Sequence, residues 1–159
     1  MTTLQRQIGM HDPFESPQQE AYLNLIRTAA ALEADFNRLF RDHALSETSY
    51  NVLRILRAAG AKGRTCTEIG RHLVVQRPDI TRLVDRLIDE GFSERARSTE
   101  DRRVVLVRIT RRGRSLVDSL DEPVRDLHAR QLGHMSPKQL NQLSRLLELA
   151  RSQAQGDSR

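Results

Sequence analysis

Residues 65–110 restrict the possible folds of this chain more than any other stretch. The stretch begins with Thr65 and Glu68, whose spacing lets the hydroxyl and the carboxylate each satisfy a free backbone N–H at a helix start. Capping of this kind contributes about 1 kcal/mol. Ile69 and Leu73 then give one inward face, and the pattern stops near residue 75. We therefore predict a short, well-capped helix.

A second amphipathic segment follows directly. Gln76-Arg77-Pro78-Asp79 opens it, because Pro78 suits the first turn of a helix and Asp79 favours its positive end. Gly91 ends it. The predicted buried stripe consists of Ile80, Leu83, Val84, Leu87 and Ile88.

The rest of the stretch predicts a β-hairpin. Residues 92–97 and the β-branched residues 104–109 are predicted strands, joined by a turn at residues 98–102. Eight arginines and two acidic residues lie between positions 95 and 114. This pattern predicts a basic hairpin with Arg97, Arg102 and Arg103 near its tip.

Further helical patterns flank this stretch. Ser16, Ser46, Thr110 and Ser136 suit N-caps, and Pro123 lies inside one pattern, where proline can kink a helix. Gly133 ends that helix. The first long helix carries an apolar stripe made of Tyr22, Leu25, Ile26, Ala29, Leu32, Phe36, Leu39 and Phe40.

The expected fold is mainly α, a winged helix-turn-helix with one small β-hairpin wing. We assign the winged domain to residues 45–110 and the long flanking helices to residues 17–43 and 111–151. We expect the ends, 1–16 and 152–159, to be flexible. Aromatic residues make up 4% of the chain and tryptophan is absent, so the core should consist mostly of Leu, Val, Ile and Ala.

The positive charge is concentrated in the predicted winged domain. Residues 62–114 contain 14 basic and eight acidic residues, a net charge of +6, whereas the whole chain carries +5. A local excess of this kind is expected of a surface that binds phosphates. The alternative is a solvated, arginine-rich surface.

A helix-turn-helix presents the start of its second helix to the major groove of DNA. We therefore expect Arg86 to meet phosphate and the residues nearer the helix start to reach base edges, namely Gln76, Arg77, Asp79, Thr81 and Arg82. The full predicted DNA-binding set is Thr65, Thr67, Gln76, Arg77, Pro78, Asp79, Thr81, Arg82, Arg86, Arg97, Asp101, Arg102 and Arg103.

The wing supplies the second predicted contact. Arginines at its tip suit the minor groove, where the potential is most negative. Asp101 is expected to orient a neighbouring guanidinium, that of Arg97 or Arg103. The alternative is a hairpin whose charges only increase solubility.

These patterns together resemble the MarR-type winged-helix transcriptional regulators over residues 17–151. One departure is Gln76-Arg77-Pro78, where the family often has a small hydroxyl residue. The resemblance rests on Thr67-Glu68-Ile69-Gly70, the DITRLVDRL run at 79–87, Gly91-Phe92, Asp101-Arg102-Arg103 and Ile109-Thr110-x-x-Gly113.

The resemblance implies a homodimer formed through residues 17–43 and 111–151, which reads a pseudo-palindromic operator. It implies that Arg103 reaches the minor groove, and it favours repression over activation. Many members of the family respond to small phenolic or other aromatic acids that bind between the dimer helices and the winged domain. Phe36, His43 and Tyr50 are candidates for such an effector pocket, with ordinary core packing as the alternative.

Other kinds of site have weak support. Cys66 is the only cysteine, so neither an intrachain disulfide nor a cysteine zinc cluster can form, and a reducing cytoplasm is expected. His43, His128 and His134 lie far apart, and we expect no metal and no cofactor. The chain shows no signal peptide, no membrane span and no catalytic motif. A nonspecific architectural DNA-binding protein, or a metal- or redox-responsive regulator of the same fold, remains as an alternative.

Overall fold

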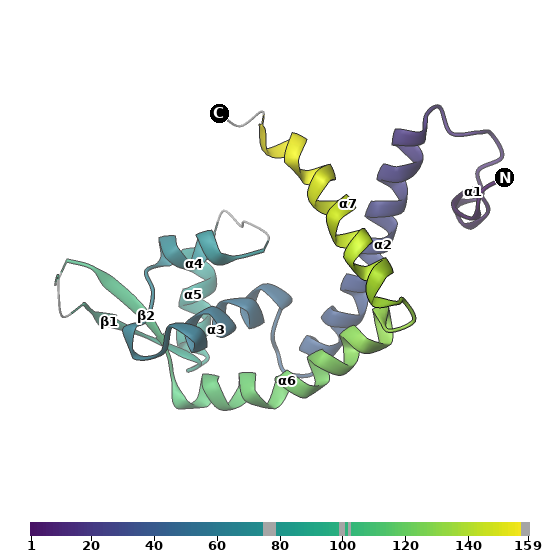
Figure 1. The fold of residues 1–159 in the computed structure, drawn as a ribbon. Helices are drawn as coiled ribbons and strands as arrows, with labels where there is room; N and C mark the ends of the chain where they lie inside the picture. The colour runs from purple at the N-terminus through teal and green to yellow at the C-terminus, as the bar shows by residue number, and fades with distance from the viewer. Residues whose placement is uncertain (75–78, 99–100, 102, 157–159) are drawn as a thin grey trace. The chain divides into compact units, whose positions relative to one another are not determined.

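The computed structural model describes residues 1–74, 79–98, 101 and 103–156. The chain divides into two compact units, Met1–Leu120 and Asp121–Arg159. Its elements are mainly helices, with one two-stranded sheet, as the predicted fold class requires (Figure 1). Within the described residues, no helix combines the length and the apolar character needed to cross a membrane.

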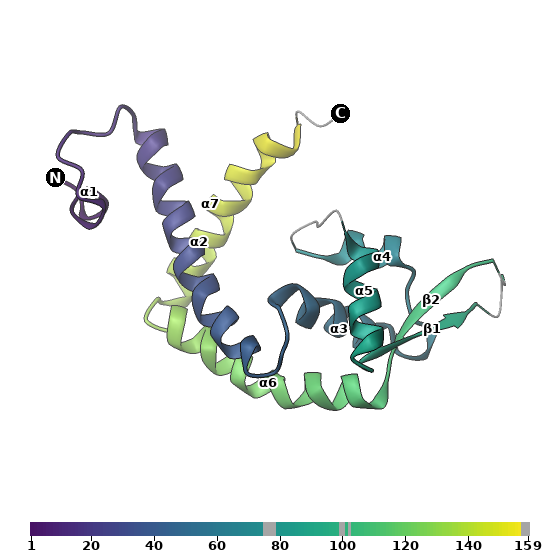
Figure 2. The ribbon, with the colours of Figure 1, turned by 180° about the vertical axis from the view of Figure 1, so that it is seen from behind.

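Three helices and a hairpin form the centre of the first unit. The helices are α3 (Glu47–Ala59), α4 (Cys66–His72) and α5 (Ile80–Asp89), with a 3-10 turn, η1 (Gly60–Lys62), after α3. Strands β1 (Ser93–Arg97) and β2 (Val105–Ile109) extend from this group of helices, and both Figure 1 and the reverse view in Figure 2 show the hairpin projecting from them. This is the predicted winged helix-turn-helix.

The predicted helix caps are confirmed. The Ser46 hydroxyl accepts from the Ser49 N–H at 3.0 Å. At α4, the Glu68 N–H donates to the Thr65 hydroxyl at 3.2 Å, and the Thr65 N–H donates to the Glu68 carboxylate at 2.8 Å. Both caps were readable from the sequence because they join residues only three positions apart.

The start of α5 differs from the prediction. The helix begins at Ile80, and Asp79 is its N-cap, with the Asp79 carboxylate accepting from the Arg82 N–H at 3.2 Å. The sequence had placed Asp79 inside the first turn. Three of the residues predicted to open this helix, Gln76, Arg77 and Pro78, lie outside the described residues. Of the predicted buried stripe, Ile80, Val84 and Leu87 are buried, whereas Leu83 and Ile88 are half-buried.

The hairpin pairs in an antiparallel register from Ser93 opposite Ile109 to Arg97 opposite Val105. Arg64 flanks β2 on its other edge: its N–H donates to the Val107 carbonyl at 3.0 Å and its carbonyl accepts from the Val107 N–H at 2.7 Å. Gly63, at φ +69°, makes this approach possible, because a Cβ there would lie 2.7 Å from the Val107 oxygen. The wing is therefore held at its base by the segment before α4.

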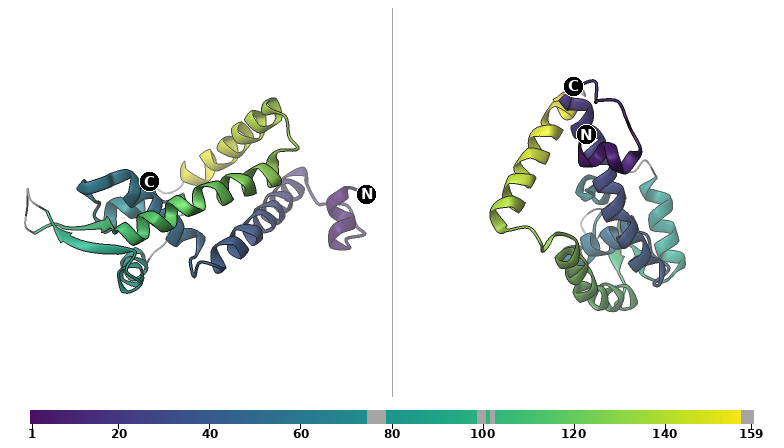
Figure 3. Two further views of the ribbon diagram at one scale, coloured as in Figure 1. Left: turned by 90° about the horizontal axis from the view of Figure 1, so that it is seen from below. Right: turned by 90° about the vertical axis from the view of Figure 1, so that its right-hand side faces the viewer.

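One apolar core joins these elements. Figure 3 shows the hairpin extending away from the helices, so its tip contributes little to this core, whereas Val107 near its base is 1% exposed. Leucine, isoleucine and valine predominate, as the composition predicted. The largest fully buried side chains are Phe40, Leu53, Leu56, Ile69, Leu87, Leu120, Val52, Val84, Val107 and Val117.

Helix α2 (Pro17–Arg41) has two different halves. Ser16 caps it and Pro17 occupies its first turn, as predicted. Near its end, Phe40 is fully buried, whereas Tyr22 and Ile26 in the first half are 62% and 51% exposed. Part of the apolar stripe predicted for this helix therefore faces solvent in the single chain.

A short helix, α1 (Thr3–Ile8), lies in the segment that was expected to be flexible. Thr2 and Gln5 form a capping box at its start, and Leu4 and Gln5 are buried. The sequence analysis missed this helix because six residues are too few to show a periodic pattern.

Helices α6 (Arg111–Leu132) and α7 (Pro137–Gly156) complete the chain. The Gly113 N–H donates to the Thr110 hydroxyl at 3.0 Å, and the Gln139 N–H donates to the Ser136 hydroxyl at 3.4 Å, so both predicted caps are present. Helix α6 continues through Pro123 and ends before Gly133. Helix α7 extends five residues beyond the predicted end at residue 151.

Candidate nucleic-acid interface

Helix α5 presents polar side chains to solvent. Thr81 and Arg82 in its first turn and Arg86 in its last turn are exposed, and the Arg82 side chain is 88% exposed. Asp79 differs from them, because its carboxylate is engaged in capping the helix. Arg82 is therefore accessible to a ligand at the start of α5 and Arg86 near its end, while Asp79 stabilises the helix start.

Helix α4 provides two of the predicted contact residues, and they differ in accessibility. Thr67 is exposed, whereas Thr65 is half-buried and its hydroxyl both accepts from the Glu68 N–H and donates to the Glu68 carboxylate, the latter at 2.9 Å. The Thr65 hydroxyl is therefore engaged in capping α4. Thr67 remains free to contact a neighbouring molecule.

The same hydrogen bonds lower the pKa of the Glu68 carboxylate. The hydrogen bond from the Thr65 backbone N–H holds the pKa of Glu68 below its ordinary value of 4.5, and the Thr65 hydroxyl and the nearby charges of Arg64 and His72 act in the same direction. Glu68 is thus a capping residue that favours its charged form.

The wing tip is ordered by backbone hydrogen bonds. The Asp101 carboxylate accepts from the Arg103 N–H at 2.9 Å, and the Ser98 N–H donates to the Val104 carbonyl at 3.0 Å. The sequence had predicted that Asp101 would orient the guanidinium of Arg97 or Arg103, and the structure corrects this: Asp101 shapes the turn instead. Arg102 lies outside the described residues.

The two described wing arginines are free for recognition. The side chains of Arg97 and Arg103 are exposed, and no ion pair joins either of them to a carboxylate of the described residues. Other arginines of the domain are paired: Arg86 with Glu90 at 3.1 Å and Arg82 with Asp79 at 4.0 Å. Arg97 and Arg103 therefore place two positive charges on the wing that no described carboxylate pairs with.

An ion pair that the sequence analysis missed joins the wing to α5. Arg95 on β1 donates to the Asp85 carboxylate at 2.5 Å. The two residues are ten positions apart, and only the packing of β1 against α5 brings them together. A search for oppositely charged residues would have found many such pairs in this arginine-rich stretch, without indicating which of them form.

Two of the three residues proposed to line an effector pocket, Phe36 and Tyr50, lie in an aromatic stack. Tyr50 is 3% exposed and stacks on Phe40, with ring centroids 4.7 Å apart, and Phe36 stacks on the same ring at 5.9 Å. His43 is exposed. The positions of Phe36 and Tyr50 fit the alternative interpretation, core packing.

Candidate metal and redox groups remain scattered. Among the residues that the structure describes, no cluster of three or more His, Cys, Asp or Glu could hold a metal ion. His128 and His134 are exposed, and Cys66 is a half-buried free thiol at the first residue of α4.

Comparisons with known proteins agree with this geometry. The family model described as "MarR family" matches residues 45–105, which include α3, α4, α5 and the wing. The HTH-type transcriptional repressor IacR of Pseudomonas putida is 30% identical over 125 residues, which cover 79% of this chain and 74% of IacR. A MarR transcription factor from Planctomyces limnophilus is 44% identical, covering 86% of this chain and 99% of its own, with a TM-score of 0.65.

The chain belongs to the MarR family. It is a DNA-binding transcriptional regulator, and its relatives are regulators and not enzymes. The MepR–DNA complex from S. aureus shares the MarR fold, with a TM-score of 0.74 at 18% identity over 83% of this chain and 97% of MepR. The two-stranded sheet β1–β2 corresponds to the wing of the winged-helix fold, and α5 is the second helix of the helix-turn-helix.

Proposed function

We propose that this MarR-family regulator is a cytoplasmic homodimeric repressor. It reads a pseudo-palindromic operator through two recognition helices and two wings, and a small organic acid releases it. DNA reading, dimerisation, and repression with release by a small molecule are supported by separate observations.

Exposed arginines on α5 and on the wing support the proposal that the protein reads DNA sequence. Arg82 lies at the start of α5, and Arg97 and Arg103 lie on the wing, all with exposed side chains. A helix start suits the major groove, where guanidinium groups can grip guanine, and a basic wing suits the narrower minor groove. The other members of the proposed contact set are Thr67, Gln76, Arg77, Pro78, Thr81, Arg86 and Arg102.

The apolar surface of α2 supports the dimer. Tyr22, Leu25 and Ile26 are 62%, 42% and 51% exposed on one face of this helix. Grouped exposed apolar residues of this kind mark interaction sites on proteins. A second copy of the chain would cover them and would set two recognition helices at a fixed separation.

Relatives support repression and release by a small molecule. The name of IacR identifies it as a transcriptional repressor. The family resemblance adds a response to small aromatic acids, which would act by favouring a conformation that does not bind DNA.

Selection of operator sequences tests the proposal. Duplexes that bind the purified chain are selected from random DNA. The affinity for the selected sequence is then compared with the affinity for a scrambled duplex at fixed salt. The expected result is a site of two inverted half-sites about one DNA turn apart. Equal affinity for both duplexes, with a steep dependence on salt, would instead identify a nonspecific architectural protein.

A further inference from the structure

An ion pair connects the wing to α5 at the base of the hairpin. The Arg95 guanidinium on β1 donates to the Asp85 carboxylate at 2.5 Å, and both side chains are about half exposed. Strand β1 packs against α5, which brings the two residues together. Two further ion pairs at α5 join residues only three or four positions apart and reach no other element. The Asp85–Arg95 pair is therefore a connection between elements.

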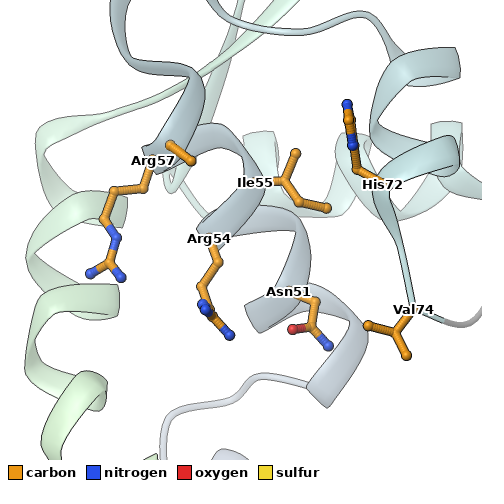
Figure 4. Close-up of a pocket in the computed structure, with 7 residues that line it drawn as sticks. Asn51, Arg54, Ile55, Arg57, His72 and Val74 are labelled. Carbon is orange, nitrogen blue, oxygen red and sulfur yellow. The ribbon is translucent and has the colours of Figure 1, made fainter. Parts of the chain in front are cut away.

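Another ion pair between elements holds a different part of the same unit. The Arg57 guanidinium donates to the Asp118 carboxylate at 2.7 Å and joins α3 to α6. Figure 4 shows the Arg57 side chain leaving α3 on the side opposite His72. Of these two pairs, only that of Asp85 and Arg95 involves the wing.

Strand alternation places Arg97 on the same face of β1 as Arg95, because successive side chains of a strand point to opposite faces. Ser93, also on this face, is 3% exposed, and Val107, opposite Arg95 in the register, is 1% exposed. At the base of the hairpin this face is therefore directed towards the core. Arg97 is exposed and lies about 7 Å beyond Arg95, at roughly 3.3 Å per residue. Fixing Arg95 against α5 fixes the direction in which this outer part of the strand leaves the helices.

The wing is held through both of its strands. The backbone of Val107 on β2 is hydrogen-bonded to Arg64, and Arg95 on β1 is paired with Asp85. An attachment along one strand alone leaves a hairpin able to swing about that strand, whereas attachments on both strands fix its orientation. Contact residues are positioned accurately only when the residues that support them are themselves held by such interactions.

We propose that Asp85 is a positioning residue for DNA binding. Through Arg95 it sets the angle between the wing and α5, so that the exposed arginines of both elements reach one duplex together. Asp85 itself makes no contact with DNA in this role. The inference rests on the proposed function for the contact of the wing with DNA, and it deepens that function by naming the residue that orients the wing.

Simple electrostatics predicts the opposite effect for Asp85. A carboxylate beside a surface that binds phosphates repels DNA, and this one also compensates the charge of Arg95. If that were its whole effect, removing its charge would release Arg95 and strengthen binding. A positioning role predicts weaker binding, although the chain becomes more positive.

The affinity of the full chain for the selected operator, measured by fluorescence anisotropy at fixed salt, separates these two effects. Asp85→Asn should weaken binding about two- to fivefold, the size expected for an exposed ion pair. Asp89→Asn is the matched control, because Asp89 is an exposed aspartate at the end of the same helix. This change removes the same charge and keeps the Asp85–Arg95 pair, so it should leave binding unchanged or strengthen it.

A second comparison shows whether Asp85 acts through the wing. Its background combines Arg97→Ala with Arg103→Ala, and all affinities are measured at one lower salt concentration, where weakened variants still bind. In this background Asp85→Asn should weaken binding by less than about twofold, because residues that act through one another have non-additive effects. Urea unfolding should show nearly unchanged stability in Asp85→Asn, since exposed ion pairs contribute little to it.

The positioning role is supported if Asp85→Asn weakens binding in the natural chain, Asp89→Asn does not, and the loss disappears in the background without the two wing arginines. Unchanged or tighter binding in Asp85→Asn overturns it, as does an equal loss in both aspartate variants or in both backgrounds. A large loss of stability in Asp85→Asn would also overturn it, because the pair would then serve folding. Failure of the proposed function is seen separately, as equal affinity of the natural chain for the selected and the scrambled duplex.

Discussion

Arg103 is the single residue on which the wing contact depends most. Its side chain is exposed, and its backbone N–H is already bound by Asp101. The side chain can therefore be removed without disturbing the turn, because the hydrogen bond that shapes the turn belongs to the backbone.

Arg103→Ala should lower operator affinity about tenfold or more, by analogy with the loss of one good arginine contact. Its free energy of unfolding should change by less than about 0.5 kcal/mol. Fluorescence anisotropy at fixed salt gives the affinity and urea unfolding gives the stability. Arg145→Ala, which removes an exposed arginine from α7, is the control. An equal loss in both variants would show that only total charge matters.

Glu68 makes the stability of the chain depend on pH. Its pKa in the folded chain lies below the ordinary 4.5, so the carboxylate stabilises the fold above that pH. The stabilisation is lost as the pH falls through the lowered value, because the protonated acid is a weaker acceptor for the Thr65 N–H.

Glu68→Gln should therefore be less stable than the natural chain at about pH 6, and this difference should shrink towards about pH 3. Urea unfolding at a series of pH values measures it. Glu33→Gln, at an exposed position of α2, serves as the control. A difference between Glu68→Gln and the natural chain that stays constant over this range would contradict the role of the charge.

At the scale of elements, a close backbone approach determines how α6 leaves the wing. A Cβ on Gly113 would lie 2.1 Å from the Phe92 carbonyl oxygen and 3.0 Å from Ile109 Cγ1. The Thr110 hydroxyl also donates to the Gly91 carbonyl at 2.8 Å, so the start of α6 is fastened to the end of α5. Only glycine allows this contact.

Gly113→Ala should destabilise the fold by about 1–3 kcal/mol, the usual range for overpacking. Gly70→Ala is the matched control inside α4, where the new Cβ meets Ile80 Cγ1 at an ordinary 3.5 Å. It should be neutral or stabilise by up to about 1 kcal/mol, since alanine favours helices. Thermal unfolding compares the two, and similar losses in both would argue against the close contact as the cause.

At the scale of the whole molecule, DNA reading by two half-sites requires two copies of the chain. The exposed apolar face of α2 is the proposed contact surface, and Ile26 lies at its centre. A charge placed at a buried contact is costly unless it is paired.

Ile26→Glu should weaken self-association about tenfold or more, given the cost of burying an unpaired charge. Thr28→Glu introduces the same side chain on the opposite side of α2 and should leave association unchanged. Sedimentation equilibrium gives the association constants. A dimer of unchanged strength in Ile26→Glu would remove this face of α2 from the interface.

Much of this architecture could be predicted from the sequence because it depends on local chemistry. The capping pairs Thr65 with Glu68 and Ser136 with Gln139 join residues three apart, and the buried stripe of α5 follows from helical periodicity. The β-branched residues of 104–109 likewise predicted the second strand of the wing. Interactions within one element or one turn are encoded by spacing alone.

Tertiary structure alone decided the contacts between elements. Asp85 meets Arg95, and Gly113 approaches Phe92, because β1 and the start of α6 pack where they do. Asp101 was expected to hold a guanidinium and binds a backbone N–H instead. The spacing of residues along a chain does not contain such distances, because they depend on how separately formed elements pack together.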